Sequence, residues 1–216
     1  HYFSFDIRHI NTEMFSLITK YGFPTALMGI LISCNYNFDV FMLNWLNAGN
    51  VEIGKYGVAY SLSNMLWILP DAFKELIYNK TVKNINKKYV DKCIGINMLF
   101  CIAICIGFFF LGKIFLNLVY GREYEKAFLV TMTLFIGIIP MVAFKLIHPV
   151  YVNDGRSIIV VLLLTISVLT NVAVSYILIP EYGAFGAAIA SVTSYSVCGF
   201  LFYLKFSHDY RIDKEE

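Results

Sequence analysis

The 216-residue chain is 58% hydrophobic and 15% charged, and its mean hydropathy is +0.66. Soluble domains have roughly 45–50% apolar and about 25% charged residues, so this composition excludes a soluble globular protein and indicates an integral membrane protein. The net charge of +2 and the lack of a basic patch interleaved with aromatic residues argue against nucleic-acid binding. The expected partner is therefore the lipid bilayer.

Six apolar runs are long enough to cross a bilayer, because a spanning helix needs about 20 apolar residues. They are approximately residues 22–46, 56–77, 94–119, 128–152, 157–179 and 184–206. The connections between them are short, and no stretch is polar enough to form a separate soluble domain. The sequence predicts an all-α integral membrane protein in which residues 1–216 form one lobe of six transmembrane helices. The chain begins with His1 rather than Met, so we expect it to be a piece of a longer protein.

The distribution of basic residues predicts the orientation of these helices. Six spans place both chain ends on one side, and that side carries most of the lysines and arginines. The opposite loops carry only Lys55, Lys113, Arg122 and Lys126. Because basic residues gather on the cytoplasmic side, the termini and the basic loop at 81–92 are predicted to be cytoplasmic. That loop is interpreted as a topology signal, with binding of anionic lipid heads as the alternative.

The first span, 22–46, contains polar groups that are costly in hydrocarbon unless they face protein or water. At 100° per residue, one narrow stripe is apolar, whereas Asn35 and the carboxylate of Asp39 lie on the far side of the helix. This pattern is typical of a helix that lines a pathway. Asp39 is expected near the outer end, where a structural role in tying this span to the next is an alternative to ion coupling.

The second span, 56–77, carries a polar and aromatic stripe along one side, and Pro70 is expected to bend it. The stripe consists of Tyr60, Asn64, Trp67, Asp71, Lys74, Glu75 and Tyr78. One interpretation is that its charged residues snorkel at the cytoplasmic end and pair with one another. The other is that they form the charged wall of a water-filled cavity.

In the fourth span, 128–152, Lys145 and His148 lie toward the cytoplasmic end. Lys145 could reach the interface with its long stem. Alternatively, Lys145 and Lys74 lie at similar depth, and two ammonium groups at one level of a cavity would suit a phosphate-bearing substrate.

The last two spans have patterns typical of helix packing. Ser167, Asn171 and Ser175 recur at every fourth position of the fifth span, which indicates interhelical hydrogen bonds. The sixth span has a seam of small residues that favours close approach of two helices. The seam consists of Gly183, Gly186, Ala187, Ala190, Ser194 and Cys198.

Motifs for chemistry are missing from the sequence. There is no glycine-rich phosphate loop ending in Lys-Ser/Thr, and no paired-carboxylate site in a water-accessible loop. Cys101 and Cys105 share a helix face, but no His or carboxylate accompanies them, so no metal site is predicted. We therefore expect no catalytic residue, no metal and no cofactor, and the protein is not predicted to be an enzyme.

Several strings resemble bacterial polysaccharide flippases, a family of the multidrug/oligosaccharidyl-lipid/polysaccharide exporter superfamily. They are Tyr21-Gly-Phe-Pro24, Asp39-Val-Phe-Met-Leu43, Glu52-Ile-Gly-Lys-Tyr-Gly-Val-Ala-Tyr60, Tyr120-Gly-Arg-Glu-Tyr124 and Ile179-Pro-Glu-Tyr-Gly-Ala-Phe-Gly-Ala-Ala-Ile-Ala190. These strings follow the family's order in its C-terminal half. The resemblance implies a transporter of two six-helix lobes around a central cavity, with the N-terminal lobe missing from this chain.

By this resemblance, the substrate is an oligosaccharide on a polyprenyl pyrophosphate, flipped from the inner to the outer leaflet by alternating access. The implied setting is the bacterial inner membrane during surface polysaccharide assembly, with a polysaccharide polymerase as a further partner. Lys74 and Lys145 are the candidates to bind the pyrophosphate. Asp39, Asp71 and Glu75 are the candidates for ion coupling, and Asn35, Tyr60, Asn64, Trp67 and Tyr78 are the other candidates for substrate contact.

Two alternatives remain open at this stage. A cation-coupled multidrug exporter of the same superfamily would favour an aromatic, acidic cavity, for which Tyr60, Trp67 and Tyr78 beside Asp71 are suitable. A non-transporting membrane scaffold or a glycan polymerase is the other alternative, although a polymerase would be expected to have a large outer loop. The net charge of the cavity separates the polysaccharide flippase from the multidrug exporter, because a basic cavity suits pyrophosphate and an acidic one suits cationic drugs.

Overall fold

The computed structural model describes residues 12–81 and 87–210, and these residues form helices and turns without a strand. The helices are α1 (Thr12–Trp45), α2 (Asn50–Leu66), α3 (Ile68–Thr81), α4 (Lys87–Tyr120), the 3₁₀ helix η2 (Arg122–Ala127), α5 (Phe128–Asn153) and α6 (Ser157–Asp209). Among the described residues, four helical stretches are long and apolar enough to cross a membrane: Ile18–Trp45, Lys87–Tyr120, Arg122–Asn153 and Ser157–Asp209. The prediction of an all-α membrane protein is confirmed.

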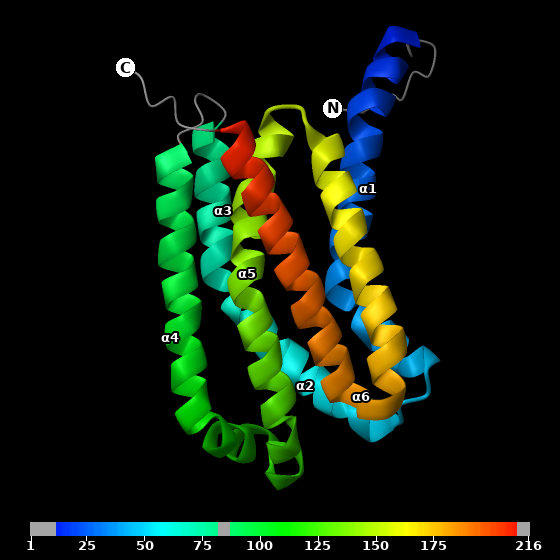
Figure 1. Ribbon diagram of the computed structural model, residues 1–216, viewed down its shortest axis with the longest axis vertical. Helices are drawn as coiled ribbons and strands as arrows, with labels where there is room; N and C mark the ends of the chain where they lie inside the picture. Colours follow the sequence, from blue (N-terminus) through cyan, green and yellow to red (C-terminus); the bar gives the residue numbers. More distant parts are fainter. Residues whose placement is uncertain (1–11, 82–86, 211–216) are drawn as a thin grey trace, which may run out of the picture.

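The predicted fifth and sixth spans lie in α6, which bends sharply at Gly183. This glycine has φ 55° and ψ −129°, a conformation that side chains with a Cβ rarely adopt. Pro180 precedes it and lacks the amide hydrogen that a continuous helix requires. The two halves of α6 consequently form a hairpin, drawn in yellow and in orange to red in Figure 1.

The predicted second span falls on two helices, α2 and α3, which meet at Trp67. Pro70 explains the break, because its ring would clash with the carbonyl of Leu66, the last residue of α2. Neither helix is among the four stretches that are long and apolar enough to cross a membrane. The division of the chain into six transmembrane spans therefore remains a prediction.

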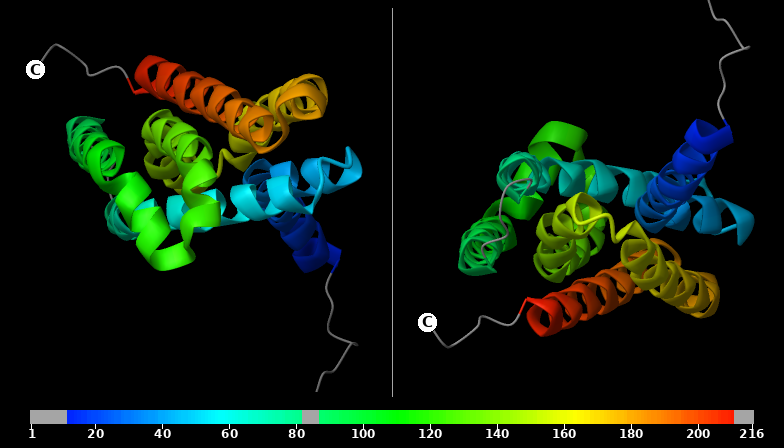
Figure 2. Two further views of the ribbon diagram at one scale, coloured as in Figure 1. Left: turned by 90° about the horizontal axis from the view of Figure 1, so that it is seen from below. Right: turned by 90° about the horizontal axis from the view of Figure 1, so that it is seen from above.

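Helix α5 lies at the centre and packs against α2, α3, α4 and α6, whereas α1 packs mainly against α6. Figures 1 and 2 show α2 crossing obliquely at the lower end of the bundle, beside the bend of α6. The beginning of α1, the α5–α6 turn and the end of α6 lie at the opposite, upper end (Figure 1). That upper end is the side predicted to be cytoplasmic.

Two glycines of α6, of which only Gly186 belongs to the predicted small-residue seam, permit unusually close helix contacts. A Cβ on Gly199 would lie 1.9 Å from the carbonyl oxygen of Pro140, so the α6 and α5 backbones nearly touch. A Cβ on Gly186 would lie 2.4 Å from the carbonyl oxygen of Leu178 in the other half of α6. Large apolar side chains on the outer surface of α4, such as Phe110 and Leu118, are exposed, as expected for a helix that faces lipid.

Candidate functional site

Four charged side chains of α3 and α5 form one cluster, hereafter the charged cluster: Asp71, Lys74, Glu75 and Lys145. The Lys145 ammonium donates a hydrogen bond to Asp71 Oδ2 at 3.0 Å. Lys74 Nζ lies 3.6 Å from Asp71 Oδ1 and 3.4 Å from Glu75 Oε1. Both lysines thus share the carboxylate of Asp71, which places their ammonium groups at similar depth.

Lys145 is held in place by an aromatic wall as well as by Asp71. Lys145 is only 8% exposed, and its ammonium lies 4.2 Å from the ring centroid of Trp67 and 5.9 Å from that of Tyr36. The Tyr36 and Trp67 rings are themselves in contact, with centroids 5.7 Å apart. A cation over a desolvated aromatic face is attracted by the negative potential of the ring, so these contacts fix the ammonium inside the lobe.

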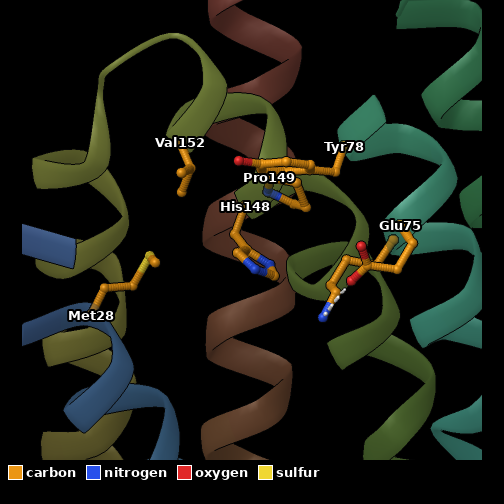
Figure 3. Close-up of a pocket in the computed structure, with 7 residues that line it drawn as sticks. Met28, Glu75, Tyr78, His148, Pro149 and Val152 are labelled. Atoms are coloured by element: carbon orange, nitrogen blue, oxygen red, sulfur yellow. Dashed lines mark ion pairs between the residues drawn. The ribbon is translucent and has the colours of Figure 1, made fainter. Parts of the chain in front are cut away.

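A pocket of about 230 Å³ opens beside the charged cluster, between α1, α3 and α5. Its lining residues are Met28, Lys74, Glu75, Tyr78, His148, Pro149 and Val152. Figure 3 shows Glu75 and Tyr78 on one side of the pocket and Met28 on the opposite side, with His148 between them, and a dashed line marks the ion pair that Glu75 forms with Lys74. The His148 ring stacks on Phe144, and its Nδ1 lies 3.2 Å from the Phe144 carbonyl oxygen. The pocket therefore offers a cation and an imidazole to a polar ligand.

The charged cluster is balanced in charge, since two lysines face two carboxylates. This balance favours neither a strongly basic site for pyrophosphate nor a strongly acidic site for cationic drugs. The two lysines nevertheless differ. Lys145 is buried and hydrogen-bonded, whereas the side chain of Lys74 is 30% exposed and its two ion pairs exceed 3.3 Å. Lys74 is thus the cation that an incoming anion can reach.

Asp39 lies outside this pocket, fully buried in contacts with three other helical segments. Its Oδ2 accepts hydrogen bonds from the Tyr56 hydroxyl at 2.9 Å and the Ser191 hydroxyl at 2.7 Å, and its Oδ1 accepts one from Asn171 Nδ2 at 2.9 Å. These donors come from α2 and from both halves of α6. Asp39 thereby ties α1 to the rest of the lobe.

Asn35, one helical turn away, forms a second polar layer with α6. Its Oδ1 accepts hydrogen bonds from Ser194 at 2.8 Å and Ser167 at 3.3 Å, and the residue is fully buried. Within the described part of the chain, Asn35 Nδ2 has no hydrogen-bond partner. Asn35 and Asp39 therefore belong to a buried polar seam between α1 and α6. The seam contains the predicted interhelical positions Ser167, Asn171 and Ser175.

The stripe predicted on the second span is divided by the break at Trp67. On α2, the Tyr60 hydroxyl donates to Asn37 Oδ1 at 2.8 Å and its ring stacks on Tyr56, whereas Asn64 is exposed. On α3, Tyr78 lines the pocket and its backbone carbonyl accepts a hydrogen bond from Asn153. The structure therefore brings Trp67 and Asp71 to Lys145 and places Tyr78 on the wall of the neighbouring pocket, whereas Tyr60 and Asn64 of α2 contact neither.

Glu52 joins α2 to the bend of α6, a contact that the sequence did not predict. Its Oε2 accepts the backbone amide hydrogen of Ala184 at 3.1 Å, and its Oε1 pairs with Lys55 at 2.5 Å. Partial burial raises the pKa of Glu52, but the bonds from Lys55 and Ala184 outweigh it and hold this pKa below its ordinary value. A Cβ on Gly183 would lie 2.9 Å from Glu52 Oε2, so the contact between Glu52 and the Ala184 amide also requires glycine there.

Sequence reasoning also missed Tyr56 and Ser191 as partners of Asp39. Tyr56 stands one turn before Tyr60, and Ser191 stands one turn after Ala187 of the small-residue seam. The available signal was the helical spacing itself, because a buried carboxylate requires donors from neighbouring helices. Which helices those are depends on the packing.

The fold and these sites define a multi-pass, all-α membrane protein with a buried polar seam and a charged pocket near one end. A family model described as "Lipid II flippase MurJ" matches residues 59–216, and the chain therefore belongs to this family. The match confirms the superfamily expected from the sequence and the class of lipid-linked precursor flippases, which are transporters and not enzymes. Searches of curated proteins and of solved structures found no match.

Proposed function

We propose that this chain is the C-terminal lobe of a flippase for a polyprenyl-pyrophosphate-linked oligosaccharide repeat unit, moved from the inner to the outer leaflet for surface polysaccharide assembly. The observation that carries the proposal is the reachable ammonium of Lys74 beside the buried, aromatic-backed ammonium of Lys145. Two cations that share one carboxylate can transfer part of their pairing to a phosphate group.

The proposed binding step exchanges one anion for another. A pyrophosphate entering the pocket displaces Glu75 and one oxygen of Asp71 from Lys74, while Asp71 keeps its hydrogen bond to Lys145. His148 and Tyr78 line the same pocket and can donate hydrogen bonds to the phosphate or the first sugar. The polyprenyl tail stays in the bilayer throughout, since only the polar head is costly to move through about 30 Å of hydrocarbon.

Transport in this proposal requires a second lobe, because six helices on one side cannot enclose a glycan and shield it from lipid. The two lobes rock about the site in alternating access. The pocket is lined by residues near the ends of α3 and α5, and these helix ends lie at the upper end of the bundle in Figure 1. The proposed orientation makes that end cytoplasmic in the bacterial inner membrane. We further propose that Asp39 serves ion coupling through its contacts to both halves of α6, with Asp71 and Glu75 as the other coupling candidates.

Lipid II itself is the second candidate substrate, and the family match over residues 59–216 favours it. Both candidates present an anionic lipid-linked saccharide, so the charged cluster suits each of them. The two are separated by genetics. The full-length gene is placed either in a host that lacks its polysaccharide flippase or in one whose lipid II flippase is depleted. The proposal expects restored surface glycan in the first host, and rescue of growth only in the second would assign lipid II instead.

The role of the charged cluster is tested in the rescued host with single substitutions. Lys74→Ala and Lys145→Ala are each expected to reduce surface glycan at least tenfold at normal protein levels. The matched control is Lys88→Ala, which removes an exposed lysine near the start of α4. Unchanged glycan in both cluster variants would refute the pyrophosphate site.

A further inference from the structure

The segment from Leu66 to Asp71, hereafter the α2–α3 joint, lacks part of the hydrogen-bond ladder of a continuous helix. The Trp67 amide donates to the Asn64 carbonyl oxygen, only three residues back, at 3.2 Å. Pro70 has no amide hydrogen to donate to Leu66, and a proline in this position is a common cause of a sharp kink. Figure 1 shows α2 crossing obliquely while α3 runs along the bundle. The joint is therefore the place where the two helices can pivot.

The ammonium of Lys145 contacts both sides of the α2–α3 joint. It lies 4.2 Å from the ring centroid of Trp67, the residue between the two helices. It also donates a hydrogen bond at 3.0 Å to Asp71, which belongs to the first turn of α3. Trp67 is buried, and its ring contacts Tyr36 of α1 as well. Because Lys145 extends from α5, one cation holds the angle of the joint against the centre of the bundle.

The far end of α2 is attached to α1 and to the bend of α6. Glu52 accepts the amide hydrogen of Ala184 at 3.1 Å. One turn further along α2, the Tyr56 hydroxyl donates to Asp39 at 2.9 Å and lies 3.0 Å from the Ser191 hydroxyl. A change of angle at the α2–α3 joint therefore acts on these contacts, which lie at the predicted outer end of the lobe.

The carboxylate of Asp71 connects the α2–α3 joint to the pocket beside the charged cluster. Lys74 lines that pocket, and its ammonium lies 3.6 Å from Asp71 Oδ1. When a phosphate group takes Lys74, Lys145 is the only cation that Asp71 keeps among the described residues. The whole charge of the carboxylate then attracts the Lys145 ammonium, because no second cation shares it. This attraction draws the ammonium from the face of Trp67 toward α3.

We propose that the α2–α3 joint is a hinge that pyrophosphate binding releases. In the ligand-free lobe, Lys145 holds Trp67 and Asp71 in one arrangement. Binding at Lys74 moves the Lys145 ammonium off the indole, α2 changes its angle to α3, and the contact between Glu52 and the bend of α6 opens. The inference rests on the proposed function, because it uses the pyrophosphate site, and it adds the element through which that site acts on the outer end.

The fluorescence of Trp67 measures the first step, in full-length protein whose other tryptophans are replaced by phenylalanine. Farnesyl pyrophosphate is expected to shift the emission saturably, and farnesol, which has the same tail without phosphate, is expected to leave it unchanged. Lys145→Met should show the shifted emission without any ligand, because no ammonium lies over its indole. Calorimetry on the same samples measures binding. Binding without a shift overturns the hinge alone, whereas absence of binding overturns the pyrophosphate site and the hinge with it.

A second variant changes the α2–α3 joint and leaves the charged cluster intact. Pro70→Ala restores an amide hydrogen for the Leu66 carbonyl and stiffens the joint. It is expected to bind farnesyl pyrophosphate as the native protein does, but to flip a lipid-linked oligosaccharide at least tenfold more slowly in proteoliposomes. Pro24→Ala is the matched control, because Pro24 lies inside α1 without dividing it. Native flipping by Pro70→Ala, or an equal loss in Pro24→Ala, overturns the hinge.

Discussion

Substitution of Asp39 tests whether the buried polar seam holds the helices of the lobe together. Asp39→Ala removes the acceptor for Tyr56, Asn171 and Ser191. Asn171 Nδ2 then has no partner among the described residues, whereas the Tyr56 hydroxyl still lies 3.0 Å from the Ser191 hydroxyl, and Ser191 still donates to the Ala187 carbonyl oxygen at 3.2 Å. Interhelical hydrogen bonds in membranes contribute about 0.6 kcal/mol on average and up to about 1.7 kcal/mol. A buried donor left unpaired costs about 1–3 kcal/mol. We therefore expect the free energy of unfolding to fall by about 2–5 kcal/mol.

The measurement is equilibrium denaturation of the full-length protein in micelles, followed by the loss of helical circular dichroism. Asp39→Asn is expected to lose roughly half as much, because an amide oxygen still accepts hydrogen bonds and the hydroxyls can reorient toward it. Asn44→Ala is the matched control on the same helix, since Asn44 is exposed. If Asp39→Ala is as stable as Asn44→Ala, the three hydrogen bonds do not hold α1 against α2 and α6, and the reasoning is wrong.

Two further predictions concern packing and pH. Gly199→Ala forces α6 away from Pro140 and is expected to destabilise the protein by about 1–3 kcal/mol, as overpacking does. The control is Gly107→Ala on α4, where the added Cβ meets nothing and should stabilise the protein by about 0.5–1 kcal/mol. Equal melting temperatures of the two variants would contradict the close contact between Gly199 and Pro140. The pKa of Glu52 is below its ordinary value, so the carboxylate contributes stability at neutral pH that is lost as the pH falls through this lowered pKa. The melting temperature should therefore fall less between pH 7 and pH 3 in Glu52→Gln than in the native protein, and Glu123→Gln is the control. Identical pH profiles of Glu52→Gln and the native protein would exclude a stabilising role for the bonds of Glu52 to Lys55 and Ala184.

The sequence predicts much of this fold because hydrophobic length and helical spacing are local properties. The break at Pro180–Gly183 and the small-residue seam were both predicted from residue type and are present in α6. The division of the second span was only partly foreseen. Pro70 indicated a bend, but the separation into α2 and α3 and the oblique course of α2 depend on contacts with α5.

The sites were less predictable because they depend on which helix faces which. The sequence placed Asp71, Lys74 and Glu75 on one line and Lys145 at similar depth, and these four meet in the structure. It placed Asn35 and Asp39 on a polar face, but it could not choose between a cavity and a neighbouring helix. Their partners in α6 are more than 130 positions away in the chain, so no spacing rule reaches them.

The central claim is that Lys74 and Lys145 carry the anionic head of a lipid-linked oligosaccharide across the membrane in a two-lobe transporter. The most direct measurement uses the full-length protein in proteoliposomes with a fluorescent polyprenyl-pyrophosphate oligosaccharide. It follows the fraction of labelled glycan that becomes accessible to an outside quencher. We predict flipping by the native protein, at least tenfold slower flipping by the Lys74→Ala/Lys145→Ala double variant, and none by the 216-residue lobe alone. Native rates in the double variant, or flipping by the isolated lobe, would contradict the account.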